Sequence, residues 1–160
     1  MTAIQVLYTV ALTLAGSIAI AYTMLWLQSR VRKKKLLRAL YHEIVGNISV
    51  AKHNVEILNV LERHREKESI AEWTYFDISP LYTSSYQDFR LSGEGIGLPE
   101  AIRMTLDEAY ELVLTHNRQV SFLTFEWPPR TGGVLERLES IIEKLDLLQA
   151  QMEKTIKYLH

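Results

Sequence analysis

"AIQVLYTVALTLAGSIAIAYTMLWL", residues 3–27, contains no charged side chain. As a helix rising about 1.5 Å per residue, these 25 residues would be roughly 37 Å long, more than the hydrocarbon thickness of about 30 Å. Tyr8 lies near one end of the stretch, and Tyr22 and Trp26 lie near the other, where aromatic rings favour lipid headgroups. The sequence therefore predicts a transmembrane helix over residues 1–29.

A cleavable signal peptide is the competing interpretation, because residues 19–21, "AIA", resemble a cleavage site. However, no Lys or Arg precedes the apolar stretch, and the stretch continues beyond residue 21 into a basic cluster. We therefore favour a retained helix over a cleaved one.

The basic cluster occupies residues 30–38, which we interpret as a juxtamembrane stop-transfer segment. Its members are Arg30, Arg32, Lys33, Lys34, Lys35 and Arg38. Short basic flanks stay on the cytoplasmic side of a membrane, so the N-terminus is expected outside and the remaining chain in the cytoplasm. The same side chains are candidates for contact with anionic headgroups.

Charge is divided unevenly along the 160 residues. The first acidic residue is Glu43, and the chain from there on has 12 basic and 19 acidic side chains, although the net charge is only -1. An acidic domain would repel phosphate, so nucleic acid is not an expected partner.

Small residues in the apolar stretch recur at a spacing of four, at Ala11, Ala15 and Ala19. Such a stripe lets a second helix approach closely. It makes these alanines candidates for a helix contact inside the membrane.

Beyond the basic cluster, apolar residues recur at steps of three and four, which is typical of amphipathic helices. No proline precedes Pro80, so the first helix is expected to continue to about residue 64. Ser79 and Pro80 resemble the start of a short helix that ends near Leu91, Pro99 starts a long one, and Thr131 caps the last. The expected fold is all-α. A transmembrane helix continues into a cytosolic antiparallel bundle of three long helices and one short helix, over residues 39–160.

Catalytic and metal-binding sets are absent from the sequence patterns. There is no cysteine, and His42, His53 and His64 are spaced too far apart along one helix to share a metal ion. We predict no catalytic residue, no metal ligand and no cofactor. A buried polar network that sets helix register is expected instead, and its candidates are Glu43, Asn47, His116 and Asn117.

Aromatic residues are dense between the first and third expected helices. They are Trp73, Tyr75, Phe76, Tyr82, Tyr86 and Phe89. Most should cover the bundle, because large rings bury much surface. Any that remain exposed would form the best candidate patch for a protein partner.

Several short motifs carry a resemblance. "LLRALYHEIVGNI" (residues 36–48) is followed by an aromatic short helix, by "LSG" (91–93) and by "LPEAIRMTLDEAYELVLTHN" (98–117). This arrangement resembles uncharacterised single-pass membrane proteins of bacteria, archaea and their viruses. The resemblance implies a membrane-tethered helical domain and no particular activity.

The leading hypothesis for function is a membrane-anchored helical interaction or assembly module without enzymatic activity. It would self-associate or serve as an accessory subunit of a membrane complex. One alternative is a holin-like or pore-forming protein that perturbs the membrane. Another is a ligand-sensing or enzymatic bundle with a polar pocket around Glu43, Asn47 and His116.

Overall fold

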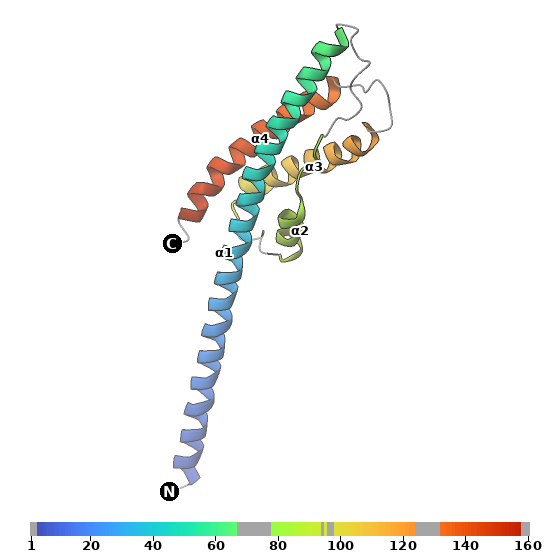
Figure 1. The fold of residues 1–160 in the computed structure, drawn as a ribbon. Helices are drawn as coiled ribbons and strands as arrows, with labels where there is room; N and C mark the ends of the chain where they lie inside the picture. The colour runs from blue at the N-terminus through green and yellow to red at the C-terminus, as the bar shows by residue number, and fades with distance from the viewer. Residues whose placement is uncertain (1–2, 67–77, 94, 96–97, 124–131, 158–160) are drawn as a thin grey trace. The chain divides into compact units, whose positions relative to one another are not determined.

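The chain is helical throughout most of the part that the structure describes. The computed structural model describes residues 3–66, 78–93, 95, 98–123 and 132–157. Its helices are α1 (Ala3–Glu66), α2 (Ser84–Leu91), α3 (Glu100–Leu123) and α4 (Gly132–Lys157), shown in Figure 1. No strand occurs in the described residues. The prediction of an all-α chain with three long helices and one short helix is confirmed.

The chain divides into two compact units, Met1–Lys35 and Leu36–His160. We call them the N-terminal unit and the bundle unit, and α1 contributes to both. The bundle unit begins at Leu36, three residues before the predicted boundary at residue 39. The physical reason is that Leu37 is already buried, at 1% exposure, so packing starts before the basic cluster ends at Arg38.

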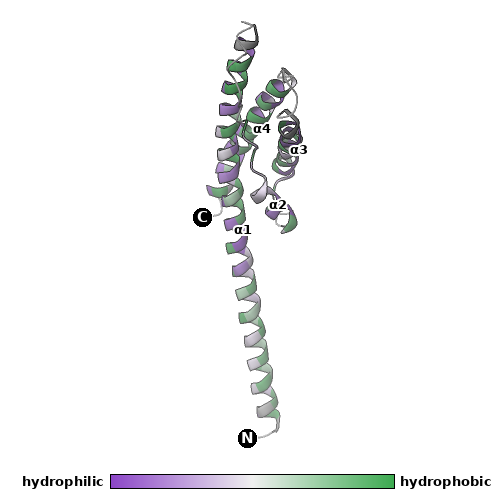
Figure 2. Cartoon of the chain, turned by 45° about the vertical axis from the view of Figure 1, so that its right-hand side comes forward, coloured by the Kyte–Doolittle hydropathy of each residue, from purple (hydrophilic) through white to green (hydrophobic). Residues whose placement is uncertain are grey.

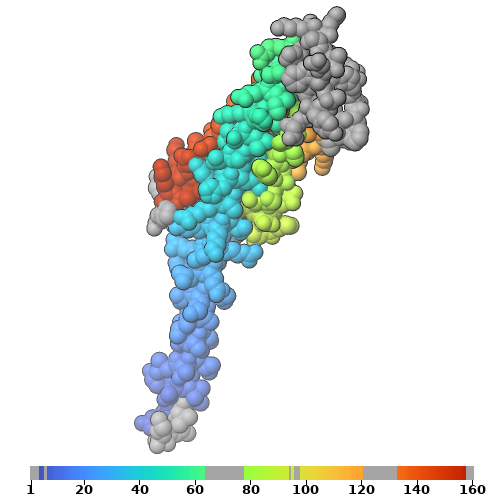
Figure 3. Space-filling view, viewed as in Figure 1, coloured from blue at the N-terminus to red at the C-terminus, as the bar shows by residue number. Residues whose placement is uncertain are grey.

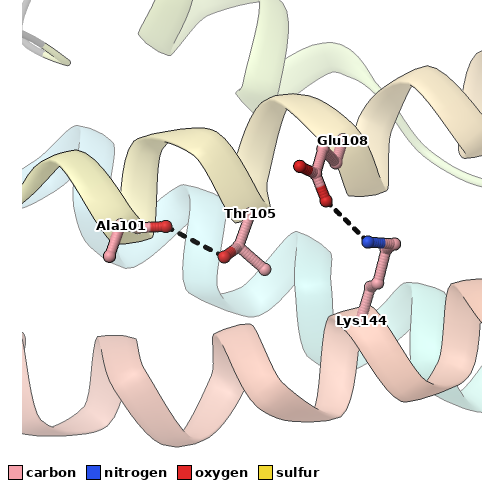
Figure 4. A network of polar contacts seen from close by, with 4 residues as sticks. All are labelled: Ala101, Thr105, Glu108 and Lys144. Carbon is pink, nitrogen blue, oxygen red and sulfur yellow. Dashed lines mark hydrogen bonds and ion pairs between the residues drawn. The ribbon is translucent and has the colours of Figure 1, made fainter.

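Helices α3 and α4 run in opposite directions and form the closest helix pair of the bundle unit (Figure 1). Both present apolar stripes to the core, in which Leu106, Leu138 and Leu145 are at most 2% exposed. A surface ion pair links them, with 2.6 Å between Lys144 Nζ and Glu108 Oε2 (Figure 4). An exposed pair of this kind contributes about 1 kcal/mol or less, so burial of the stripes holds the pair together.

Helix α1 packs on the same core through its second half. Leu40, Ile44 and Leu58 are at most 1% exposed. Tyr41 donates a hydrogen bond to Glu153 of α4 at 2.7 Å, and Lys52 lies 3.8 Å from Asp146. The α1 residue with the higher number, Lys52, pairs with the α4 residue with the lower number, Asp146. The two helices are therefore antiparallel.

An extended segment, residues 78–83, enters the bundle between α1 and α3, and we call it the strap. The prediction that a helix starts at Ser79 and Pro80 is wrong, because α2 begins at Ser84. The backbone groups at Ser79, Leu81 and Tyr82 are bonded to side chains of other helices rather than to a helical ladder. The predicted cap of the last helix, Thr131, lies outside the described residues.

Candidate functional site

The first part of α1 is a surface of exposed apolar side chains. Every large hydrophobic residue whose side chain is described between Ile4 and Leu27 is 51–80% exposed. Among the described residues, α1 is the one helix long and apolar enough to cross a membrane, and none of its most apolar window is buried inside the chain. In Figure 2 this part of α1 is mostly green, and purple begins where the basic residues start. An exposed apolar surface of this extent is typical of a segment that contacts a membrane or another protein.

The hydroxyl groups in this part of α1 are bonded to the helix's own carbonyls. Thr9 donates to Gln5 O, Thr13 to Thr9 O and Thr23 to Ala19 O, each at 2.8 Å. Ser17 donates to Leu14 O at 2.9 Å. A hydroxyl paired in this way exposes no unsatisfied donor, which is what an apolar solvent such as lipid demands.

The basic residues surround α1 instead of forming one stripe. At about 100° per residue, the five basic side chains of the N-terminal unit leave no gap wider than about 100° around the helix. The guanidinium of Arg30 lies 4.8 Å from the centre of the Trp26 ring, an amphipathic pair at the end of the apolar stretch. A collar of this kind is typical of a helix that crosses the headgroup layer, whereas a helix lying on the surface is basic on one side.

Three asparagine side chains hold the strap by its backbone. Asn54 accepts from Ser79 N at 3.1 Å and donates to Ser79 O at 2.8 Å. Asn117 makes the same pair of bonds with Leu81, at 2.8 and 2.7 Å, and Asn47 does so with Tyr82, at 2.6 and 2.8 Å. Each side-chain amide therefore pairs the backbone N–H and C=O of one strap residue, as a neighbouring strand would in a sheet. Packing between helices alone would leave these backbone groups unsatisfied.

The carboxylate of Glu43 caps α2 from a different helix. It accepts hydrogen bonds from Ser85 N at 2.6 Å, Tyr86 N at 3.1 Å and the Ser84 hydroxyl at 3.2 Å. Thr83, at the N-cap position, makes no side-chain cap bond. An acid at a helix N-terminus satisfies the first amides and complements the helix dipole, so Glu43 does both from α1.

Two stacked tyrosines extend the network. The rings of Tyr86 and Tyr110 lie 4.1 Å apart at 11°. Tyr110 donates to Glu43 Oε1 at 2.8 Å, and Tyr86 donates to Asp107 at 2.8 Å. Burial and then the hydrogen bond to Asp107 raise the pKa of Tyr86 to about 12, and burial and then the Glu43 charge raise the pKa of Tyr110 further. Both phenols therefore remain proton donors.

His116 is buried but does not join this network. It is 0% exposed, and neither ring nitrogen has a hydrogen-bond partner among the described residues. The prediction that His116 belongs to a buried polar network is therefore right about burial but not about the network. Burial and then the charge of Arg137 lower the pKa of His116 to about 4.

The predicted polar network is thus assembled in part. Glu43, Asn47 and Asn117 converge on residues 79–86, and His116 stays apart. Glu43 and Asn47 bind the strap and α2 instead of each other. Asn54 and Tyr110 were missed, although Asn54 follows Asn47 by seven residues and so lies on the same helix face.

The aromatic candidates divide between core and surface. Tyr86 and Phe89 are buried at 3% and 2% exposure, whereas Tyr82 is 59% exposed. Trp73, Tyr75 and Phe76 lie outside the described residues. Within the described part of the chain, no three His, Asp or Glu side chains lie close enough together to hold a metal ion.

No protein-family model, no curated protein and no solved structure matches this chain.

Removing one asparagine clamp should destabilise the bundle unit. Asn47→Ala leaves the N–H and C=O of Tyr82 without their partner, which costs about 2 kcal/mol. Asn54→Ala should behave alike at Ser79. Denaturant unfolding of the full chain in detergent micelles, followed by circular dichroism, measures the loss. The matched control is the exposed Asn59 on the same helix, and equal midpoints for N47A and N59A would contradict the clamp.

Stability should decrease as the pH falls, through His116. Because its folded pKa is about 4 and an unfolded histidine titrates near 6.5, the unfolded state takes up the proton first. Stability is then complete above pH about 6.5 and declines toward pH about 4, by up to about 3 kcal/mol. Unfolding measured at several pH values should show this slope, and His116→Leu should flatten it between pH about 5 and 6.5. His53→Gln, an exposed histidine of α1, should keep the wild-type slope; a wild-type slope in H116L would overturn the assignment.

Proposed function

We propose that this protein is a single-pass membrane protein whose bundle unit is a cytosolic interaction or assembly module without enzymatic activity. The observation that carries the proposal is the exposed, uncharged part of α1 ending at a basic collar. Lipid is the solvent in which such a surface is stable.

A soluble core helix and a signal sequence both match the first part of α1 less well than a membrane span does. The core helix of a soluble protein is mostly buried within its own chain, whereas this window is not buried at all. A signal sequence would also lie near the N-terminus, but the basic collar follows the apolar stretch and does not precede it. The collar favours a stop-transfer segment, with the N-terminus outside and the bundle unit in the cytoplasm.

The polar residues of the bundle unit support a structural role. Glu43 accepts four hydrogen bonds from the chain itself, and the Asn47 amide is occupied by Tyr82 on both its atoms. These groups have their partners within the fold, so a ligand would have to displace the strap or α2. This favours an interaction module over a sensor or an enzyme.

Self-association through the membrane is the form of assembly that the sequence favours. Ala11, Ala15 and Ala19 are all exposed on α1 and lie within about 80° of each other around the helix axis. Small side chains along one face allow two helices to approach closely in lipid.

The membrane anchor can be tested by fractionation of the full chain. Wild-type protein expressed in bacteria should remain with membranes after alkaline carbonate washing. Replacing Leu14 and Ile18 together by Arg should release it, since each central charge costs about 2.5 to 3.5 kcal/mol of insertion free energy. The control places the same two charges at Ala39 and Ser49, which are exposed positions of α1 in the bundle unit. Recovery of the wild-type chain in the soluble fraction would refute the anchor.

Helix contact can be tested by the size of the full chain in mild detergent. Ala15→Leu should weaken self-association roughly tenfold, because helix contacts in lipid amount to about 1 to 2 kcal/mol. Ala21→Leu makes the same change outside the stripe and should have no effect. A chain that is monomeric as wild type, or equally affected by both substitutions, would contradict contact through this face.

A further inference from the structure

The C-terminal end of α2 carries an unusual exposed leucine. Leu91 is 87% exposed, more than any other large hydrophobic side chain described in the bundle unit. The chain then turns away through Gly93, whose φ of 71° suits glycine. Nothing in the local geometry requires an apolar residue at Leu91, because the core contact of this turn of helix is made by Phe89, which is 2% exposed.

Hydrogen bonds fix where this end of α2 lies within the bundle unit. Ser79, Tyr82 and Ser85 bond to α1 residues of decreasing number. Their partners are Asn54, Asn47 and Glu43, respectively. Helix α2 starts beside Glu43, only seven residues beyond Leu36, and its eight residues extend about 12 Å from there. Its last turn therefore lies near the end of the bundle unit at which α1 enters, and Figure 3 shows α2 (lime) directly against α1 (cyan).

We call this end of the bundle unit the entry end. The last turn of α4 lies there too, because α4 is antiparallel to α1 and Glu153 bonds to Tyr41. The first two turns of α3 lie beside α2, because Tyr86 bonds to Asp107. The exposed basic residues of the entry end are Arg38, Arg90, Arg103, Lys154 and Lys157, and its exposed acidic residues are Asp88, Glu100, Asp107 and Glu153. Basic side chains thus predominate here, whereas acidic ones predominate beyond residue 42 as a whole.

The covalent chain limits how far the entry end can be from the collar. One peptide bond joins Lys35, the last residue of the collar, to Leu36, and Arg38, the last member of the basic cluster, already belongs to the bundle unit. If the collar lies among headgroups, as the proposed function requires, the entry end starts within a few residues of them.

We infer that the entry end of the bundle unit rests on the cytoplasmic leaflet, with Leu91 inserted at the lipid interface and the basic residues of the entry end against anionic headgroups. The inference depends on the proposed membrane anchor. An apolar side chain gains by leaving water, and basic side chains beside it are attracted to an anionic surface. One exposed leucine beside Arg90, at an end of the bundle unit with several basic side chains, suits this partner, while a protein partner would be served better by a larger apolar patch.

The chain has no cysteine, so one label can be placed cleanly. Leu91→Cys and the control Leu147→Cys, on an exposed position of α4, each receive an environment-sensitive fluorophore. The labelled full chains are reconstituted into vesicles of phosphatidylcholine with phosphatidylserine. We expect emission from position 91 to shift to shorter wavelength and to be quenched by lipids that carry a nitroxide on the headgroup. Position 147 should show the emission of a label in water.

Two results would overturn the inference. If the protein floats with the vesicles but both labels are quenched alike or not at all, the entry end does not rest on the leaflet, and the anchor still stands. If the protein does not float with the vesicles, the anchor itself fails and the inference fails with it. The label at position 91 could also keep its emission shift when phosphatidylserine is omitted. That result would assign the contact to Leu91 alone and would overturn the role proposed for the basic residues.

Discussion

The bundle unit depends on pairing the backbone of a strap that has neither a helical ladder nor a neighbouring strand. A buried N–H or C=O without a partner costs as much as a lost hydrogen bond, so an extended segment between helices is normally unfavourable. Here three asparagine amides supply both a donor and an acceptor to one strap residue each. The strap can therefore fill the space between α1 and α3, bringing Leu81 and then α2 with Phe89 into the core.

The same constraint accounts for the N-terminal unit. Its surface is apolar along residues 3–27, and in lipid no water would pair an open backbone group. A continuous helix pairs its own backbone groups. The hydroxyls of Thr9, Thr13 and Thr23 are paired as well, because each donates to a carbonyl of the preceding turn. The first part of α1 thus pairs its polar groups within the helix. The second part of α1 offers the side chains of Asn47 and Asn54 to the strap.

Periodicity in the sequence predicted the three long helices, because each of them repeats its apolar residues every three or four positions. It did not predict the strap, since Ser79 and Pro80 have the local features of a helix start. Their actual partners, Asn54 and its neighbours on α1 and α3, are distant in sequence, and no local rule links an asparagine in one helix to a backbone elsewhere. For the same reason Glu43 was recognised as a buried polar residue, but its role as the cap of α2 was not.

The position of Glu43 also explains why the charge division of the sequence persists in the fold. It is the first acidic residue after the basic cluster, so it is the nearest acid along the chain that could compensate that cluster. Its carboxylate instead accepts bonds from α2 and Tyr110. Like charges of the basic collar repel one another in water, and anionic headgroups would relieve this repulsion. The acidic remainder of the bundle unit is repelled by the same surface, so in the proposed arrangement charge favours an orientation with only the entry end toward the lipid.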